Sequence, residues 1–247
     1  MGKVSLQFLG CGDAFGSGGR LNTCFFVSAE PARFLIDCGA TALPAMRRFR
    51  VRPNDVGLVL LSHLHGDHFG GLPAFLLEAQ LVSKRRGPLT IAGPPGIRER
   101  LEQAMEVLYP HSSKTDWAFP LEIVALEPEA ERRLGGVTVT PYVVSHPSGA
   151  PSFALRIVCD GRVIAFSGDT EWTESLIPAA RGADLFIAEC YSYERKVPHH
   201  TDLMTLKAHL DEIRPKRLVL THMSPDVLDR RDVGGFERAK DGLVVEL

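Results

Sequence analysis

Four side chains of the kinds that bind metal ions lie within six residues of this chain. They are the three histidines and the aspartate of the segment His63-Leu64-His65-Gly66-Asp67-His68. Neutral imidazole and carboxylate groups suit zinc and similar divalent ions. The end of a hydrophobic segment is a costly place for four polar side chains unless each of them has a partner. The segment therefore predicts a metal site.

Three further candidate ligands each follow a predicted strand. His146 ends the run VTVTPYVVSH, Asp169 ends VIAFSGD and His222 ends LVLTH. In open α/β sheets, ligands gather beyond the carboxyl ends of the strands, so we expect these side chains to join the first cluster. The set then contains five histidines and two aspartates, which is enough for two metal ions with open positions for water.

The elements that must position these residues are short strands mixed with helices. Alternating or continuous apolar runs predict strands over residues 3–9, 23–27, 33–36, 56–61, 90–92, 137–144, 153–158, 162–166, 185–189 and 218–221. Helical spacing predicts helices over residues 41–50, 71–83, 97–108 and 205–213. We expect one α/β layered domain over residues 1–247, because no linker divides the chain. Both halves run from hairpins to strand–loop–helix units, which suggests a duplication.

Composition narrows the class of protein. Of the 247 residues 45% are hydrophobic and 23% are charged, values that exclude disorder, collagen and coiled coil for the whole chain. Lysine and arginine total 28 against 30 acidic residues, which argues against a protein held to nucleic acid mainly by phosphate neutralisation. No apolar run approaches the ~18 residues of a membrane span. Five cysteines without a C-x-x-C pair, and no signal-peptide core, predict a reducing cytoplasm.

The order HLHGDH, a distant histidine, the aspartate of SGDT and the histidine of LTH closely resembles the metallo-β-lactamase superfamily. The similarity extends from LGCGDAFGSGGRLNT to LVLTHMS. It implies a four-layer αβ/βα sandwich, in which two mixed sheets face each other and helices lie outside. It also implies two ions, zinc first, with manganese or iron as alternatives. The resemblance assigns His63, His65 and His146 to one ion and Asp67, His68 and His222 to the other, with Asp169 as the bridge.

Within this superfamily the chain is most similar to the phosphodiesterase branch, which includes ribonuclease Z. True β-lactamases have a cysteine where Asp169 stands, and glyoxalase-II-type thioesterases have a GHTPG-like segment where this chain has VSHPSGAPSFALRI. Glu189 and His200, in AEC and HHTDL, match a glutamate and a histidine that assist proton transfer in ribonuclease Z. The HHTDL segment is also similar to the cyclic-phosphate phosphodiesterases of phosphonate breakdown.

Two departures from these relatives bear on the substrate. Ribonuclease Z inserts a long arm that grips tRNA between the isolated histidine and the bridging aspartate, whereas His146 and Asp169 are only 23 positions apart. The clustered N-terminal cysteines of the phosphonate enzymes are not reproduced either. We expect a small phosphodiester, such as a cyclic nucleotide or a cyclic sugar phosphate. Asp67 would orient the nucleophile and accept its proton, and His200 would protonate the leaving oxygen while Glu189 holds its ring.

Several alternatives stay open at this point. The first is a ribonuclease-Z-like endonuclease for tRNA 3′ ends, with RNA as its partner. A thioesterase, a lactonase or a non-catalytic metal-binding protein is more distant. Other features have two interpretations each: the glycine-rich loop 10–19 binds phosphate or is a plain turn, and segment 109–119 is a lid or a homodimer contact. Asp37 accepts a hydrogen bond from a ligand histidine or forms a turn. The basic clusters at 47–52 and 84–86 are solvated faces or, in a homodimer, an RNA groove.

Overall fold

Hydrophobic strands form two seven-stranded sheets in the computed structural model, which describes residues 2–30 and 32–247. The first sheet has the order β14-β1-β2-β3-β4-β5-β6 and the second the order β13-β12-β11-β10-β9-β8-β7. The first sheet contains β1 (Ser5–Gly10), β2 (Cys24–Ser28), β3 (Arg33–Ile36), β4 (Leu58–Leu60), β5 (Leu89–Gly93), β6 (Leu121–Ala125) and β14 (Val244–Glu246). The second contains β7 (Arg132–Leu134), β8 (Val137–Val144), β9 (Ser152–Cys159), β10 (Arg162–Phe166), β11 (Leu185–Glu189), β12 (Leu218–Thr221) and β13 (Glu237–Arg238).

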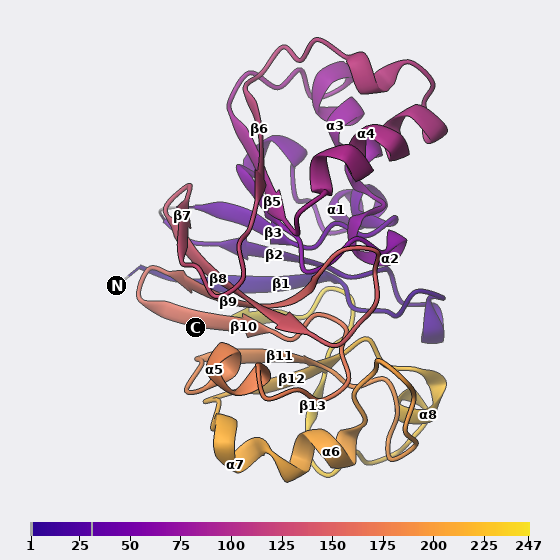
Figure 1. The fold of residues 1–247 in the computed structure, drawn as a ribbon, viewed down its shortest axis with the longest axis vertical. Helices are drawn as coiled ribbons and strands as arrows, with labels where there is room; N and C mark the ends of the chain where they lie inside the picture. The colour runs from indigo at the N-terminus through magenta and orange to yellow at the C-terminus, as the bar shows by residue number, and fades with distance from the viewer. Residues whose placement is uncertain (1, 31) are drawn as a thin grey trace.

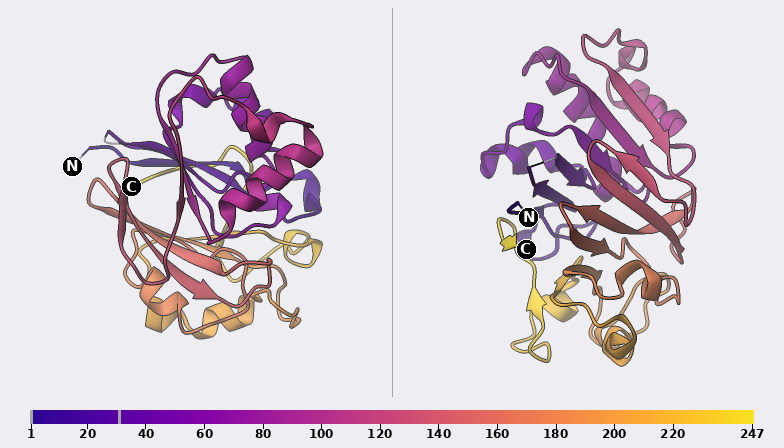
Figure 2. Two further views of the ribbon diagram at one scale, coloured as in Figure 1. Left: turned by 45° about the horizontal axis from the view of Figure 1, so that its top comes forward. Right: turned by 90° about the vertical axis from the view of Figure 1, so that its left-hand side faces the viewer.

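Helices cover the outer faces of both sheets (Figures 1 and 2). The first sheet packs against α1 (Ala42–Arg48), α3 (Leu72–Leu81) and α4 (Ile97–Leu108). The second packs against α5 (Leu176–Ala180), α6 (Leu203–Ala208) and α7 (Leu210–Ile213). Two single-turn helices, α2 (Gly66–Phe69) and α8 (Pro225–Leu228), lie in loops. The predicted four-layer sandwich is confirmed.

The same pattern of strand directions occurs in both sheets. Antiparallel pairs come first along the chain, and then β3 to β6 and β10 to β13 run parallel. This repetition agrees with the hairpins followed by strand–loop–helix units in each half of the sequence. It also brings the carboxyl ends of β4, β10, β11 and β12 to one edge of the sandwich, where His63, Asp169 and His222 follow their strands.

Aromatic side chains fill the space between the sheets. The ring of Phe25 lies 4.9 Å from that of Phe8 and 5.2 Å from that of Phe166, which belongs to the opposite sheet. All three rings are buried, and burial stabilises each by about 1.5–3 kcal/mol relative to exposure. On the outer face of the first sheet, Val59 packs against the helices. β4 is therefore buried on both faces, as its continuous apolar run predicts.

Most predicted elements lie within two residues of their observed positions, but one helix prediction is wrong. The single helix expected over 205–213 is two helices, α6 and α7, because His209 (φ −105°, ψ 3°) leaves the helical path. α6 begins earlier than expected, since the Asp202 side chain accepts a hydrogen bond from the Thr205 amide at 2.9 Å and caps the helix. The Asp160-Gly161 hairpin is confirmed, with φ of 48° and 73°. Among the described residues, no helix is both long and apolar enough to cross a bilayer.

Candidate metal centre

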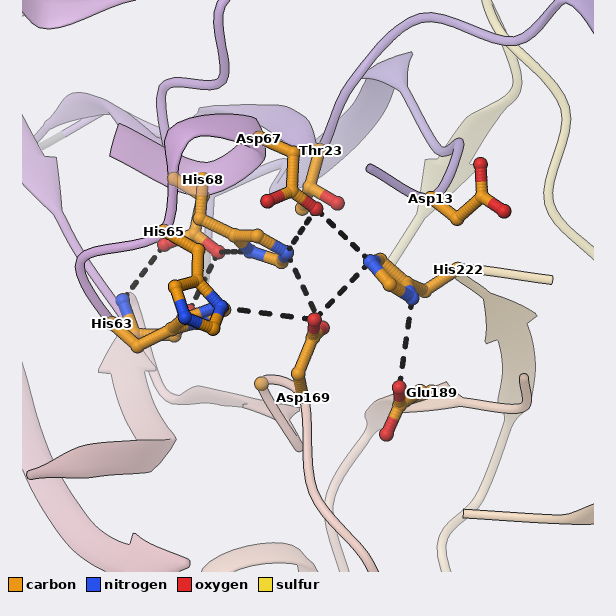
Figure 3. Close-up of polar contacts among 12 residues, drawn as sticks. Asp13, Thr23, His63, His65, Asp67, His68, Asp169, Glu189 and His222 are labelled. Atoms are coloured by element: carbon orange, nitrogen blue, oxygen red, sulfur yellow. Dashed lines mark hydrogen bonds and ion pairs between the residues drawn. The ribbon is translucent and has the colours of Figure 1, made fainter. Parts of the chain in front are cut away.

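All seven predicted ligands meet at the shared edge of the two sheets, and Figure 3 labels all of them except His146. They form two groups, and within each group one ligand atom per residue lies within 4.8 Å of the others. The first group is His63, His65 and His146, and the second is Asp67, His68, Asp169 and His222. These are the groups that the superfamily resemblance implies, and loops after β4, β8, β10 and β12 supply them.

The first group joins two sheets. His146 Nε2 lies 3.0 Å from His65 Nδ1, although the two residues are 81 positions apart. The His63 ring is fully buried and lies with its centroid 5.0 Å from each of the other two rings. Three imidazoles therefore converge from the loop after β4 and the end of β8.

Asp169 lies between the two groups. Its Oδ2 is 3.2 Å from His222 Nε2, 3.8 Å from His63 Nε2 and 3.9 Å from His146 Nε2. Its Oδ1 is 3.3 Å from His68 Nε2. This carboxylate reaches both groups, as expected for a bridging ligand. Asp67 Oδ2 closes the second group at 3.2 Å from the Nε2 atoms of both His68 and His222.

Asp37 orients a histidine of each group. His68 Nδ1 donates to Asp37 Oδ2 at 2.6 Å, so Nε2 is the ring atom of His68 that faces the centre. The Ser62 hydroxyl donates to the same oxygen at 2.7 Å, which leaves it to accept from His63 Nδ1 at 3.0 Å. Asp37 thus fixes His68 directly and His63 through Ser62. The predicted acceptor function of Asp37 has the contact it needs, whereas Ser62 was not among the predicted site residues.

His146 is oriented by a backbone carbonyl that the sequence analysis missed. His146 Nδ1 donates to the oxygen of His199 at 3.0 Å. A carbonyl has no signature in side-chain chemistry, so no motif could have predicted it. The backbone of His199 is left-handed (φ 65°), as is that of the ligand His222 (φ 54°). Such conformations are uncommon for residues other than glycine and are found in over-determined functional sites.

Burial and neighbouring charges shift the pKa values of the histidines and of Asp169 at the centre. Burial lowers the pKa of His63 well below its ordinary value. Burial also acts to lower the pKa of His68 and His222, but nearby carboxylates, Asp169 first, outweigh it. The pKa of His68 is raised well above its usual range and that of His222 to about 9. For Asp169, burial is outweighed by His222 and His68, so its pKa is well below the usual value. The Asp169 carboxylate is thus held ionised by the imidazoles that surround it.

The donor set fits divalent cations. His63 Nε2 is buried without a hydrogen-bond partner, and the buried His68 Nε2 and Asp169 Oδ1 lie 3.3 Å apart without the geometry of a hydrogen bond. An unsatisfied buried polar group ordinarily costs about 1–3 kcal/mol. Four ligands about 2.0–2.1 Å from a tetrahedral zinc lie about 3.3–3.4 Å from one another. The closest donor separations within the two groups, 3.0–3.3 Å, are near that value. These clustered residues can therefore hold metal.

Glu189 and His200 form a pair beside the second group. His200 Nδ1 donates to Glu189 Oε1, and the same oxygen lies 3.5 Å from His222 Nδ1. Glu189 is buried at the end of β11, and its Oε2 accepts the Thr170 amide at 2.8 Å. Burial raises the pKa of Glu189, and the charge of Asp169 adds to that effect. Tyr191, which the sequence analysis did not single out, stacks on the His200 ring at 4.7 Å.

Two loops outside the metal centre each had two interpretations. The Asp13 side chain accepts the amides of Phe15 and Ser17 at 3.2 and 2.8 Å, so these donors of the glycine-rich loop are engaged and favour the turn interpretation. Segment 109–119 follows the end of α4 and precedes β6, which starts at the amino end of its neighbour β5. Val107 and Leu108, which directly precede the segment, line a cavity together with Leu64 and Gly66 of the ligand loop, so its interpretations as a lid and as a homodimer contact both stay predictions.

Comparison with known proteins gives a family match and relatives that align with this chain over most of their length. Residues 4–241 match the family model described as anti-Pycsar protein Apyc1. The Mycobacterium tuberculosis protein Rv1339 is 31% identical over 230 residues, which cover 90% of this chain and 82% of the relative. A ribonuclease Z from Mycobacterium bovis is 25% identical over 244 residues, covering 91% and 87%.

Solved structures show the same fold. The metallo-β-lactamase fold protein YhfI from Bacillus subtilis superimposes with a TM-score of 0.81 at 22% identity and covers all of both chains. The short form of human tRNase Z gives a TM-score of 0.79 at 25% identity, with 98% of each chain covered. A diphosphatase of the PhnP family gives 0.77 at 18% identity, covering 99% of this chain and 98% of its own.

Proposed function

The chain belongs to the anti-Pycsar Apyc1 family, and from this premise we propose that it is a two-metal phosphodiesterase for a small or cyclic phosphodiester. It lies in the ribonuclease-Z-like branch of the metallo-β-lactamase superfamily and is a metal-dependent hydrolase. The observation that carries the proposal is that the seven predicted ligands form two groups and Asp169 contacts histidines of both, with the His200–Glu189 pair alongside. Cyclic nucleotides and cyclic sugar phosphates are the preferred substrates.

Different residues of the site have different functions in hydrolysis. His63, His65 and His146 would hold one ion, Asp67, His68 and His222 the other, and Asp169 both. When bound, two such ions lower the pKa of a water molecule and bind phosphoryl oxygens. Asp67, which is 9% exposed, orients the attacking water and accepts its proton. Protonated His200 gives its Nε2 proton to the leaving oxygen while Nδ1 stays bonded to Glu189. Burial acts to lower the pKa of His200, but the hydrogen bond to Glu189 and the charges of Glu189 and Asp169 together outweigh burial and raise that pKa, which favours the protonated ring.

The interval between His146 and Asp169 supports a small substrate. It is occupied by a hairpin made of β9, the Asp160-Gly161 turn and β10. All five residues of β10 pair with residues of β9. The interval between His146 and Asp169, all of which the structure describes, therefore consists largely of this hairpin and contains no inserted arm of the kind that the sequence comparison attributes to ribonuclease Z.

The basic clusters also lie away from the metal centre. β4 runs from η2 (Pro53–Asp55) at its amino end to His63 beyond its carboxyl end, and Arg52 is paired with Asp55 at 2.8 Å. Arg47 is paired with Glu78 at 3.2 Å, and Arg85 is buried. A polynucleotide bound at the centre therefore gains no backbone contact from these residues within one chain.

An assay panel with added Zn²⁺ or Mn²⁺ tests the substrate class. It compares bis-p-nitrophenyl phosphate, 2′,3′- and 3′,5′-cyclic nucleotides, a precursor tRNA and a thioester. We expect the highest kcat/KM with a cyclic or small diester. Efficient precursor-tRNA cleavage with weak action on small diesters would instead assign a ribonuclease-Z-like endonuclease. Turnover of the thioester alone would refute the phosphodiesterase assignment.

The number of metal ions bound per chain and the cellular compartment of the protein are two separate proposals. Metal analysis of protein purified without chelator should give nearly two ions per chain, with zinc expected first. All five cysteines are buried and free, which supports a reducing compartment such as the cytoplasm. We also retain a homodimer as a prediction, which sedimentation equilibrium will test.

A further inference from the structure

A cavity of about 390 Å³ adjoins His200. Its volume falls in the range of roughly 300–1,000 Å³ that is usual for small-molecule sites. Two loops form it: one directly follows Asp169, and the other leads from β11 into α6. The lining residues are Glu171, Trp172, Lys196, Val197, Pro198, His200, Thr201, Asp202 and Thr205.

The charged groups of this cavity are already paired. Lys196 Nζ lies 2.7 Å from Asp202 Oδ2, and Asp202 is buried as the cap of α6. Glu171 accepts a hydrogen bond from the Ser145 hydroxyl at 2.6 Å. Of the described residues that line the cavity, none offers an unpaired lysine or arginine. A second phosphate would therefore find no countercharge here.

The uncharged part of the lining is apolar and held in place. Val197, Pro198 and the Trp172 indole supply its apolar side chains. Trp172 stacks on His209 with ring centroids 3.9 Å apart and planes only 9° from parallel. It also packs against the core between α5, β8 and β9. Because the His209 ring and the core hold the indole in place, this wall of the cavity is formed before any ligand binds.

His200 connects this cavity to the reaction. Its Nδ1 is bound to Glu189, so Nε2 is the ring atom left to meet the leaving oxygen. The group attached to that oxygen must continue past His200, and the cavity has His200 in its wall. We propose that this cavity, called here the leaving-group pocket, binds the group attached to the leaving oxygen. It accepts an uncharged, ring-bearing group up to about nucleoside size and rejects a second phosphate.

This inference rests on the proposed function and adds a subsite to it. Val197→Trp fills the leaving-group pocket. Val158→Trp is the matched control, because Val158 lies near the far end of β9 and is already 37% exposed. The kinetic probes are the four common nucleoside 3′,5′-cyclic phosphates and 1,3-propanediol cyclic phosphate, which has the same six-membered diester ring without a nucleoside. The binding probes are the corresponding nucleoside 5′-phosphates, measured by calorimetry.

We expect Val197→Trp to lower the ratio of kcat/KM for a cyclic nucleotide to that for the propanediol ester at least tenfold, chiefly through KM. It should weaken binding of the nucleoside 5′-phosphate by a similar factor, while Val158→Trp changes neither quantity. An unchanged ratio with unchanged binding would overturn the inference, as would an equal loss on both esters. If wild-type protein hydrolyses no diester but Val197→Trp still weakens nucleotide binding, the proposed function fails and the pocket stands as a binding site.

Discussion

Replacing Asp37 by asparagine tests how one carboxylate controls both halves of the metal centre. The Asp37 oxygens accept from the Ser62 amide at 2.7 Å, the Ser62 hydroxyl at 2.7 Å and His68 Nδ1 at 2.6 Å. An asparagine of the same shape keeps one acceptor oxygen, which can still serve the Ser62 amide. Its NH₂ group must then face two donors that formerly bonded to a carboxylate.

The imidazole of His68 can relieve this clash by changing its tautomer. With Nδ1 accepting from the new NH₂ group, the proton moves to Nε2, and that atom loses the lone pair a metal needs. Loss of an outer carboxylate of this kind typically costs 10–100-fold in metal affinity, or about 1.4–2.8 kcal/mol. Because His68 belongs to the second group, we expect the Asp67–His68–His222 site to weaken most.

Calorimetric titration of chelator-stripped protein with Zn²⁺ measures this effect. Wild-type protein should bind two ions per chain, and the Asp37→Asn variant one tightly and one at least tenfold more weakly. Asp211→Asn, at an exposed position on α7, is the matched control and should bind like wild type. Two ions bound by Asp37→Asn with wild-type affinity would refute the argument about the His68 tautomer.

Four further outcomes follow from the site. Removing metal with a chelator should lower the melting temperature, since ions at 100 times their Kd contribute about 2.7 kcal/mol per site; equal melting curves with and without chelator would contradict this. Asp67→Ala should abolish turnover while the far-UV circular dichroism stays unchanged, and full activity of the variant would exclude Asp67 from the chemistry. His200→Ala should slow cleavage of alkyl diesters about 10²–10⁴-fold but p-nitrophenyl diesters far less, because nitrophenolate leaves without a proton; equal losses on both would contradict proton donation. Gly39→Ala would place a Cβ 2.1 Å from the Asp67 carbonyl oxygen, so it should lower the free energy of unfolding, measured in urea, by about 1–3 kcal/mol or more. In the control Gly57→Ala no atom lies nearer than 3.9 Å to the new Cβ, and the free energy of unfolding should fall by less than about 1 kcal/mol.

Local sequence patterns were sufficient to predict most of the strands and the longer helices. β3, β8, β10, β11, β12 and α4 were predicted with the limits that the structure has. Each has an apolar pattern long enough to fix its type, and turn residues mark its ends. The edge strands β6, β7, β13 and β14 were not predicted. They are two to five residues long and pair only on one side, so neighbours rather than propensity define them.

The break at His209 shows where local pattern fails. Residues 205–213 have helical spacing, and a single helix satisfies it. In the structure His209 turns out of the helix and stacks on Trp172, which comes from the loop after β10. The position of this break depends on a partner 37 residues earlier in the chain, which no window of the sequence contains.

The types of the candidate ligands, their order and their places at strand ends could all be predicted from the amino-acid sequence. The spacing His63-x-His65-x-Asp67-His68 needs no tertiary information, since one short loop holds all four side chains. Which of these side chains contact one another depends on the folding of the whole chain. It brings His146 to His65 across 81 positions, Asp37 to His68 across 31, and the His199 carbonyl to His146 across 53. These contacts depend on how two sheets pack face to face, and that packing is fixed by the whole buried core rather than by the residues that touch.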